Sequence, residues 1–227
     1  MTAQTMQIGS RPCRIYGRVN AEYILLQMTG EHELQSMESE VAAIAQGAHH
    51  FLFAAIPVEN WNDALSPWEA PAVWGKQGFG GKAADTLCFL TEQVVPTLKQ
   101  QFHLPENVKI ILGGYSLAGL FALYALYQTD VFARAASMSG SFWFEGIMEY
   151  VCSHEMKRKP DCLYFSLGDK ESSTDNPILN VVQQNTQEIE TLCHGKGIET
   201  TFVLNSGSHY QACNKRTAAG IHWILNR

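Results

Sequence analysis

The stretch Ile110-Ile111-Leu112-Gly113-Gly114-Tyr115-Ser116-Leu117-Ala118-Gly119-Leu120 decides the fold, because an apolar β-branched run meets small residues there and then a helical pattern. It predicts a strand, a sharp turn and a helix, with Ser116 at the turn. A serine in this place stands at the tip of the strand, with its hydroxyl accessible above the amino end of the helix. The turn needs small residues two positions before and after the serine, and Gly114 and Ala118 meet that need.

A serine at this position also has a simpler interpretation. The pattern Gly-x-Ser-x-Ala occurs in many unrelated chains, and its serine can cap a helix by accepting hydrogen bonds from free amides. The context favours a nucleophile, because an apolar strand precedes Ser116 directly and an apolar helix of about fifteen residues follows it. Ser116 is therefore a candidate nucleophile.

Length and charge narrow the class of protein. The 227 residues suffice for one domain with a full sheet core, and the net charge of −6 comes without any block of Lys and Arg. We therefore expect neither nucleic acid nor an anionic membrane surface as a partner. Residues 1–10 lack the basic flank and apolar core of a signal peptide, and no apolar run has the length of a membrane span. The expected location is the cytoplasm, and the oligomeric state stays open.

The six cysteines show neither a Cys-x-x-Cys pair nor zinc-like spacing. In a reducing compartment we expect them to be small apolar packing residues, and Cys88 and Cys193 fall within helical patterns. A disulfide between Cys152 and Cys162 has no support beyond their proximity in the sequence.

Strands alternate with helices along the chain, which predicts a single α/β domain over residues 1–227 with a mostly parallel sheet and helices on both faces. The expected strands cover residues 22–28, 51–58, 108–112, 133–138, 162–167 and 200–204. The expected helices cover residues 37–45, 82–102, 117–127, 146–156, 180–194 and 216–225. Residues 1–20 suggest weak edge strands. Residues 59–81 suggest a long irregular loop at the active site, because loops of this length are usually functional. Pro96 should kink the helix over 82–102, since it lacks an amide donor.

Polar residues that follow strands of a parallel sheet gather where such folds bind ligands. Ser116 follows one strand, Asp169 or Glu171 follows a later one, and His209 follows the last. In a serine hydrolase the histidine takes the proton of the attacking hydroxyl, and the acid orients and stabilises the histidine. The chain order of serine, acid and histidine is that of an α/β-hydrolase.

The acid has three candidates in one loop, Asp169, Glu171 and Asp175. We favour Glu171, because its extra methylene and its place three residues beyond the strand-end glycine give it reach across the loop. The oxyanion of the tetrahedral intermediate needs two backbone amides. The expected donors are Leu117, after the nucleophile, and Glu31, in the loop after the strand over 22–28.

Aromatic residues near the expected site have two interpretations. Core packing suits Phe142 and Phe144, whereas Trp61, Trp143 and Tyr115 are expected to contribute to substrate binding. The histidines outside the site, His222 in the last helix and the pair at 49–50, fit surface or packing roles. Neither that pair nor the run Glu31-His32-Glu33 has metal-ligand spacing, so we expect no metal site.

Taken together, four segments resemble one family. These are Gly-Gly-Tyr-Ser-Leu-Ala-Gly, the loop with Asn60-Trp61-Asn62 and Ser66-Pro67-Trp68, Leu-Gly-Asp-Lys-Glu, and Gly-Ser-His. They are similar to the putative esterase family of α/β-hydrolases, which includes esterase D-like, feruloyl and siderophore esterases, and the resemblance runs from about residue 22 to 225. It implies an α/β-hydrolase fold without a large lid domain and without a metal or organic cofactor. Ser116 and His209 match the family's nucleophile and histidine, whereas Glu171 stands where many relatives carry aspartate.

The sequence thus predicts a serine carboxylester hydrolase that acts through an acyl-enzyme on a soluble, small-molecule ester of modest size. An acyltransferase or a thioesterase would use the same residues. A non-catalytic relative that binds a ligand is the alternative from another class, and the intact set of Ser116, acid and His209 argues against it.

Overall fold

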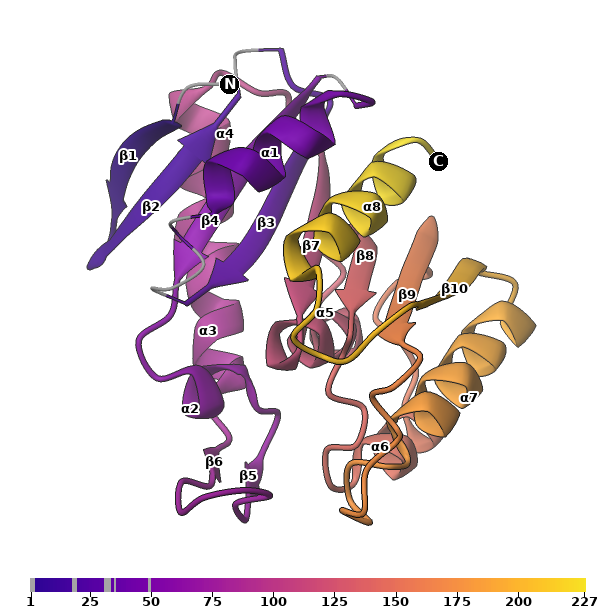
Figure 1. Ribbon diagram of the computed structural model, residues 1–227. Helices are drawn as coiled ribbons and strands as arrows, with labels where there is room; N and C mark the ends of the chain where they lie inside the picture. Colours follow the sequence, from indigo (N-terminus) through magenta and orange to yellow (C-terminus); the bar gives the residue numbers. More distant parts are fainter. Residues whose placement is uncertain (1–2, 18–19, 31–33, 35, 49) are drawn as a thin grey trace.

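The computed structural model describes residues 3–17, 20–30, 34, 36–48 and 50–227. Its centre is an eight-stranded sheet with the order β1-β2-β4-β3-β7-β8-β9-β10 (Figure 1). The strands are β1 Ala3–Ile8, β2 Arg11–Tyr16, β3 Tyr23–Thr29, β4 Phe51–Pro57, β7 Lys109–Tyr115, β8 Phe132–Met138, β9 Cys162–Gly168 and β10 Glu199–Asn205. Strands β4 to β10 of this order pair in parallel, and β1 and β2 add an antiparallel hairpin at one edge. The expected mostly parallel sheet is confirmed.

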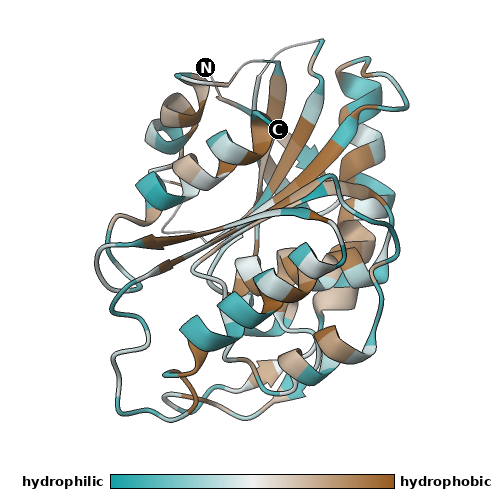
Figure 2. Ribbon diagram, turned by 90° about the vertical axis from the view of Figure 1, so that its right-hand side faces the viewer, coloured by the Kyte–Doolittle hydropathy of each residue, from teal (hydrophilic) through white to brown (hydrophobic). Residues whose placement is uncertain are grey.

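Helices cover both faces of the sheet. Helices α1 (Met37–Ala45) and α8 (Cys213–Leu225) lie together on one face, and α3 (Ala83–Phe89), α4 (Val95–Gln101), α5 (Leu117–Gln128) and α7 (Val182–Gly195) lie on the other (Figure 1). Figure 2 shows the apolar strands between these two layers. Because the inner strands β3, β4, β7, β8 and β9 are covered on both sides, their sequences are mainly apolar rather than alternating, whereas the edge strands β1 and β10 are partly exposed. None of the described helices is both long and apolar enough to cross a membrane.

Helix α5 follows the central strand directly and is almost entirely buried. Residues 117 to 127 are all buried, because α5 packs against β7 and β8 of the sheet and also contacts α2 (Trp61–Leu65). A helix that is apolar all round can lie only in such a place. The position of Ser116 is therefore fixed by the core.

The helix expected over 82–102 is interrupted, and the predicted kink at Pro96 takes a specific form. Helix α3 runs into a π-helical turn, Leu90–Val94, which leads into α4 with Pro96 in its first turn. A wide turn of this kind changes the bonding pattern where proline cannot donate an amide proton. The prediction of one α-helix was wrong at this point, and the proline explains the difference.

The sequence suggested an irregular loop over residues 59–81, but part of this segment is regular. It contains α2 and a two-stranded ribbon of β5 (Glu69–Ala70) and β6 (Phe79–Gly80). The buried Ser66 hydroxyl joins these parts, because it donates to the Asn62 carbonyl at 2.7 Å and accepts from the Gly81 amide at 2.9 Å. The indole of Trp68 donates to the Glu145 carbonyl at 2.9 Å and ties the segment to the loop after β8.

The cysteines are all free, so no disulfide joins Cys152 and Cys162. Burial raises the pKa of the Cys13 and Cys162 thiols to about 11, which fits the expected packing role. Cys152, and Cys88 on α3, are exposed, so the packing role predicted for these two was wrong. The apolar side of that helix is formed by its neighbours instead.

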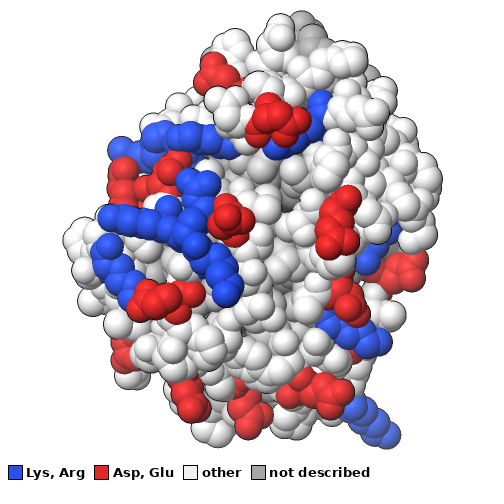
Figure 3. Space-filling view, turned by 180° about the vertical axis from the view of Figure 1, so that it is seen from behind, with Lys and Arg blue, Asp and Glu red and all other residues white. Residues whose placement is uncertain are grey.

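The back of the molecule carries both signs of charge. Figure 3 shows Lys and Arg side chains interspersed with Asp and Glu on this face. Exposed ion pairs of the protein include Lys109 with Asp161 at 2.7 Å and Lys196 with Glu155 at 2.9 Å. Pairs as exposed as these contribute little to stability.

Candidate active site

The turn between β7 and α5 holds Ser116 in a conformation that residues with side chains rarely adopt. Its backbone angles are φ 60° and ψ −125°. A Cβ atom on Gly114 would lie 2.3 Å from the carbonyl carbon and oxygen of Ala118, so only glycine fits there. The strained turn exposes the hydroxyl at the carboxyl edge of the sheet, as a nucleophile requires.

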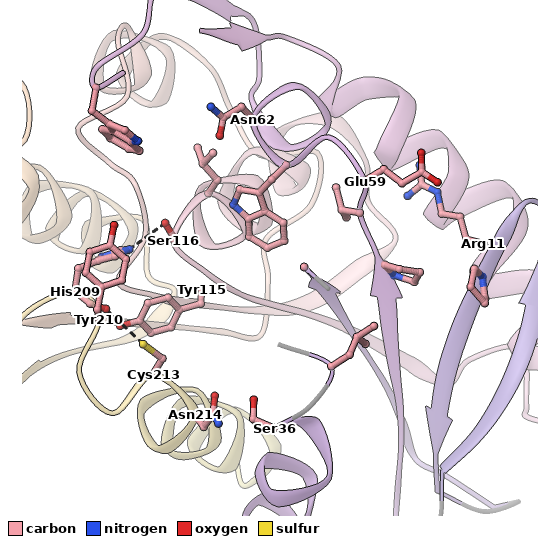
Figure 4. A pocket seen from close by; sticks show the side chains of 18 of the residues that line it. Arg11, Ser36, Glu59, Asn62, Tyr115, Ser116, His209, Tyr210, Cys213 and Asn214 are labelled. Atoms are coloured by element: carbon pink, nitrogen blue, oxygen red, sulfur yellow. Dashed lines mark hydrogen bonds between the residues drawn. The ribbon is translucent and has the colours of Figure 1, made fainter. Parts of the chain in front are cut away.

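Two hydrogen bonds join Ser116, His209 and Glu171 in a row. Ser116 Oγ lies 3.1 Å from His209 Nε2 (Figure 4). On the other side of the ring, His209 Nδ1 lies 2.7 Å from Glu171 Oε2. An ionised carboxylate only accepts hydrogen bonds, so the imidazole proton belongs on Nδ1. Nε2 is then free to accept the proton of the serine. The structure thus brings together the three side chains that the sequence singled out.

Glu171 is buried, with 4 % of its side chain exposed. Its Oε1 accepts hydrogen bonds from the Gly168 amide at 2.6 Å and the Ser139 hydroxyl at 2.8 Å, and Arg216 Nη1 lies 3.1 Å away. Burial alone would raise the pKa of this carboxyl, but the hydrogen bond and charge of His209 and the bonds from Ser139 and Gly168 outweigh it and lower the pKa. The group is held as a carboxylate.

The other two carboxylates of this loop serve elsewhere. Asp169 Oδ1 accepts the Gly207 amide at 2.8 Å, and the Asp169 amide donates to the Asn205 carbonyl at 2.7 Å. Asp169 therefore braces the loop that carries His209. Asp175 is exposed. Within the described part of the chain, Glu171 is the carboxylate that lies within hydrogen-bonding distance of His209.

Tyr115 lines the cleft, but its hydroxyl is engaged behind the histidine. It donates to the His209 carbonyl at 2.7 Å, and Ser139 Oγ, whose proton goes to Glu171, lies 2.9 Å from it. Burial raises the pKa of this phenol, so it stays protonated. The sequence predicted a contact with substrate, whereas the hydrogen bonds of Tyr115 fix the loop of His209.

Three further residues belong to this network and were missed in the sequence. Ser139 and Ser141 follow β8 at the same edge of the sheet, and Ser141 Oγ lies 3.4 Å from Ser116 Oγ. The rule that polar residues after strands gather at the site applies to both, so it offered a signal. Arg216 follows Asn214 and Lys215 in α8, so in the sequence it resembles an ordinary surface cation of a helix and gives no comparable signal.

A cleft of about 950 Å³ opens above Ser116 and His209. Trp61 and Trp74 of segment 59–81 line it. Tyr210 lies next to His209 (Figure 4). Trp143 is absent from the described lining, against the prediction that it contacts substrate, and its ring packs behind Trp74 at 5.3 Å between centroids. Phe142 and Phe144 are buried in the core, as expected.

Of the two expected oxyanion donors, Leu117 and Glu31, only Leu117 lies within the described residues. Leu117 is the first residue of α5 and lines the cleft directly beside Ser116. Glu31 lies outside the described residues, although Gly30 before it lines the same cleft.

Comparison with known proteins gives a family match over most of the chain. A family model described as "Putative esterase" matches residues 32–215. YbbA of Bacillus subtilis (strain 168), described as uncharacterized, is 22% identical over 207 residues, covering 87% of this chain and 81% of that protein.

Solved structures share the fold. An IroE-like serine hydrolase from Shewanella oneidensis superposes with a TM-score of 0.80 at 19% identity, covering 98% of this chain and 79% of that one. The siderophore hydrolase EstA from Aspergillus nidulans gives a TM-score of 0.74 at 18% identity, covering 99% and 94%. At this level of identity, the likeness shows an α/β-hydrolase fold.

Proposed function

The chain belongs to the putative esterase family and is a serine esterase, and we propose that it hydrolyses soluble carboxylic esters of modest size through an acyl-enzyme intermediate. The observation that carries this proposal is the row of hydrogen bonds from Ser116 through His209 to the buried carboxylate of Glu171. This arrangement supports the proposed roles of Ser116 as nucleophile, His209 as base and Glu171 as the group that orients the base.

In the first half of the proposed reaction, Ser116 Oγ attacks the ester carbonyl and passes its proton to His209 Nε2. The tetrahedral intermediate carries a negative oxygen, which the Leu117 amide and, in our proposal, the Glu31 amide stabilise. Collapse of the intermediate breaks the bond to the alcohol, and His209 returns the proton to the leaving oxygen. The acyl group then remains on Ser116.

In the second half, water replaces the alcohol. His209 takes a proton from the water, whose oxygen attacks the acyl carbon, and the proton returns to Ser116 Oγ as the acid leaves. Throughout both halves, Glu171 holds the Nδ1 proton and stabilises the imidazolium that forms transiently.

The cleft supports a substrate of modest size. Its volume of about 950 Å³ and its partly aromatic lining suit a small molecule rather than a polymer surface. Among the structural relatives are siderophore hydrolases, so a siderophore ester belongs in any substrate panel beside short acyl and aryl esters.

The test is pre-steady-state hydrolysis of a p-nitrophenyl ester by the wild type and Ser116→Ala. An acyl-enzyme predicts a burst of p-nitrophenol close to one equivalent per enzyme in the wild type, and no burst in the variant. Hydrolysis at equal rates in both proteins would rule out Ser116 as the nucleophile and the proposal with it.

A further inference from the structure

Arg216 contacts three separate parts of the active site from the first turns of α8. Its Nη1 lies 3.1 Å from Glu171 Oε1 and 3.2 Å from the Tyr115 hydroxyl, and its Nη2 donates to the Ser206 carbonyl at 3.0 Å. The side chain is 3 % exposed. It has no place in the acyl-transfer steps themselves, because it reaches the site from behind the carboxylate.

The two oxygens of Glu171 have different partners. Oε2 faces His209 and Oε1 faces away from it, toward Gly168, Ser139 and Arg216. A glutamate has one more rotatable bond than an aspartate, so its oxygens need more restraint to stay in one place. Three donors on Oε1 supply that restraint and leave Oε2 for the histidine.

We propose that Arg216 is a positioning residue, which clamps Glu171 by its outer oxygen and thereby fixes the orientation of His209 toward Ser116. The inference deepens the proposed function, since it assigns a residue to the same site. The planar fork of a guanidinium suits this task, because it reaches a carboxylate, a hydroxyl and a carbonyl at fixed angles, which an ammonium does not.

The clamp also joins the segments that carry the reacting groups. Tyr115 directly precedes the nucleophile, Ser206 begins the loop of His209, and Glu171 lies in the loop after β9. Arg216 therefore connects the ends of three strands in one contact. A shift of any of them by about 1 Å would misplace the histidine, and such shifts cost about 10²-fold in rate.

The packing around the clamp leaves no spare room. A Cβ atom on Gly168 would lie 2.9 Å from Glu171 Oε1, 3.0 Å from Arg216 Nη1 and 2.2 Å from the Gly207 carbonyl oxygen. Glycine at position 168 thus lets the carboxylate and the guanidinium approach the end of β9.

Charge adds a second effect to the restraint. The titratable groups beside Glu171 are His209 from the loop after β10, Arg216 from α8 and Tyr115 from β7. Among these, Arg216 is the cation that no accessible pH removes. Without it, the buried carboxyl would take up a proton at higher pH, because an unpaired buried charge is costly.

The experiment compares Arg216→Met and Arg216→Lys with Arg134→Met as a matched control. Arg134 is also buried at 4 % exposure, lies 3.6 Å from Asp161 and donates to the Ile224 carbonyl, but it sits near the amino end of β8. The readouts are kcat and KM across pH for an aryl ester, and the low-field proton resonance of the His209 Nδ1 hydrogen bond.

For Arg216→Met we expect kcat to fall about 10- to 100-fold, as when outer hydrogen-bond partners of a site are removed. KM should change little, and the acidic limb of the pH profile should move to higher pH. Arg216→Lys should recover part of kcat, because it keeps the charge. Arg134→Met should leave kcat, the pH profile and the resonance as in the wild type, even where it lowers the melting temperature.

An unchanged kcat, pH profile and resonance in Arg216→Lys and in folded Arg216→Met would overturn the clamp. If Arg216→Met does not fold, Arg216→Lys decides alone: a full wild-type profile overturns the proposal, and a lowered kcat with little change in KM supports it, because lysine keeps the charge but not the planar fork. An inactive wild type would refute the proposed function, while the resonance in the variants would still decide whether Arg216 holds the Glu171–His209 pair.

Discussion

The two sides of the cleft consist of different kinds of side chain. On the side of β9, β10 and α8, Glu171, His209 and Arg216 form a hydrogen-bonded network, in which both oxygens of Glu171 and both terminal nitrogens of Arg216 have partners. On the side of segment 59–81, Trp61 and Trp74 line the cleft, and aromatic rings such as Trp143 pack behind them. Trp74 is 54% exposed, whereas Arg216 is 3% exposed.

We expect the two sides to have different roles, with the polar side affecting the rate of reaction and the aromatic side affecting substrate binding. Proton transfer requires donor and acceptor atoms at hydrogen-bonding distance, about 2.6–3.2 Å, so a hydrogen-bonded network tolerates only small displacements. Aromatic packing is less directional and tolerates rearrangement. We therefore expect changes on the polar side to lower kcat, and changes on the aromatic side to alter KM and the choice of ester.

The largest effect should follow loss of the reacting groups. Ser116→Ala or His209→Ala should lower turnover roughly 10⁴- to 10⁶-fold, because residues of such a set act as one unit. Both positions lie at the cleft surface, so the melting temperature should stay close to that of the wild type. Measurable turnover in either variant above about one-hundredth of the wild-type rate would contradict the assignment.

The acid should come next. Glu171→Gln keeps the shape but removes the charge and offers the histidine an amide, so kcat should drop about 10³- to 10⁴-fold. Glu171→Asp should lose less, since it keeps the carboxylate at a shorter reach. Asp175→Asn is the matched control, because Asp175 is exposed in the same loop and should leave the rate unchanged. A normal kcat in Glu171→Gln would remove the acid from the mechanism.

The same carboxylate should make stability depend on pH. The pKa of Glu171 is lowered in the folded protein, so its contribution is present at neutral pH and is lost as pH falls from the ordinary glutamate range through the lowered folded pKa. Urea unfolding of the wild type should therefore show a free energy of unfolding that decreases in this acidic range. The decrease should be smaller in Glu171→Gln. An identical dependence of the free energy of unfolding on pH in both proteins would show that Glu171 is not held ionised by the fold.

The smallest effect should come from the aromatic side. Trp74→Ala should raise KM for aryl esters roughly 2- to 10-fold, equivalent to about 0.5–1.5 kcal/mol of lost ring contact. Its kcat should change little, because no hydrogen bond of the catalytic row passes through it. Trp223→Ala, which alters a ring on α8 outside the cleft, should leave KM as it is. A fall in kcat with unchanged KM in Trp74→Ala would contradict the expectation that the aromatic side affects substrate binding rather than the rate.

Much of the fold was predictable because local sequence and tertiary structure agree. The apolar strands and the Gly114-x-Ser116 turn have one structural solution each, so alternation along the chain was enough to place them. The π-helical turn before Pro96 was not predictable, because several distortions relieve the same missing hydrogen bond.

The site was predictable to the extent that it follows strand ends. Ser116, Glu171 and His209 each follow a strand, so order and spacing indicate them. Choosing Glu171 over Asp169 rested on reach, and the structure shows the physical difference: Asp169 is bonded to the Gly207 amide and Glu171 to the histidine. Arg216 reaches the site from a helix that follows, and which way a helical side chain points across three loops depends on tertiary packing.

The most direct test of the account is the intact mass of the wild type and Ser116→Ala after exposure to a fluorophosphonate. We expect a single adduct on the wild type and none on the variant, because only a serine activated by His209 reacts. No adduct on either folded protein, or an equal adduct on both, would contradict the claim that Ser116 is the activated nucleophile of this cleft.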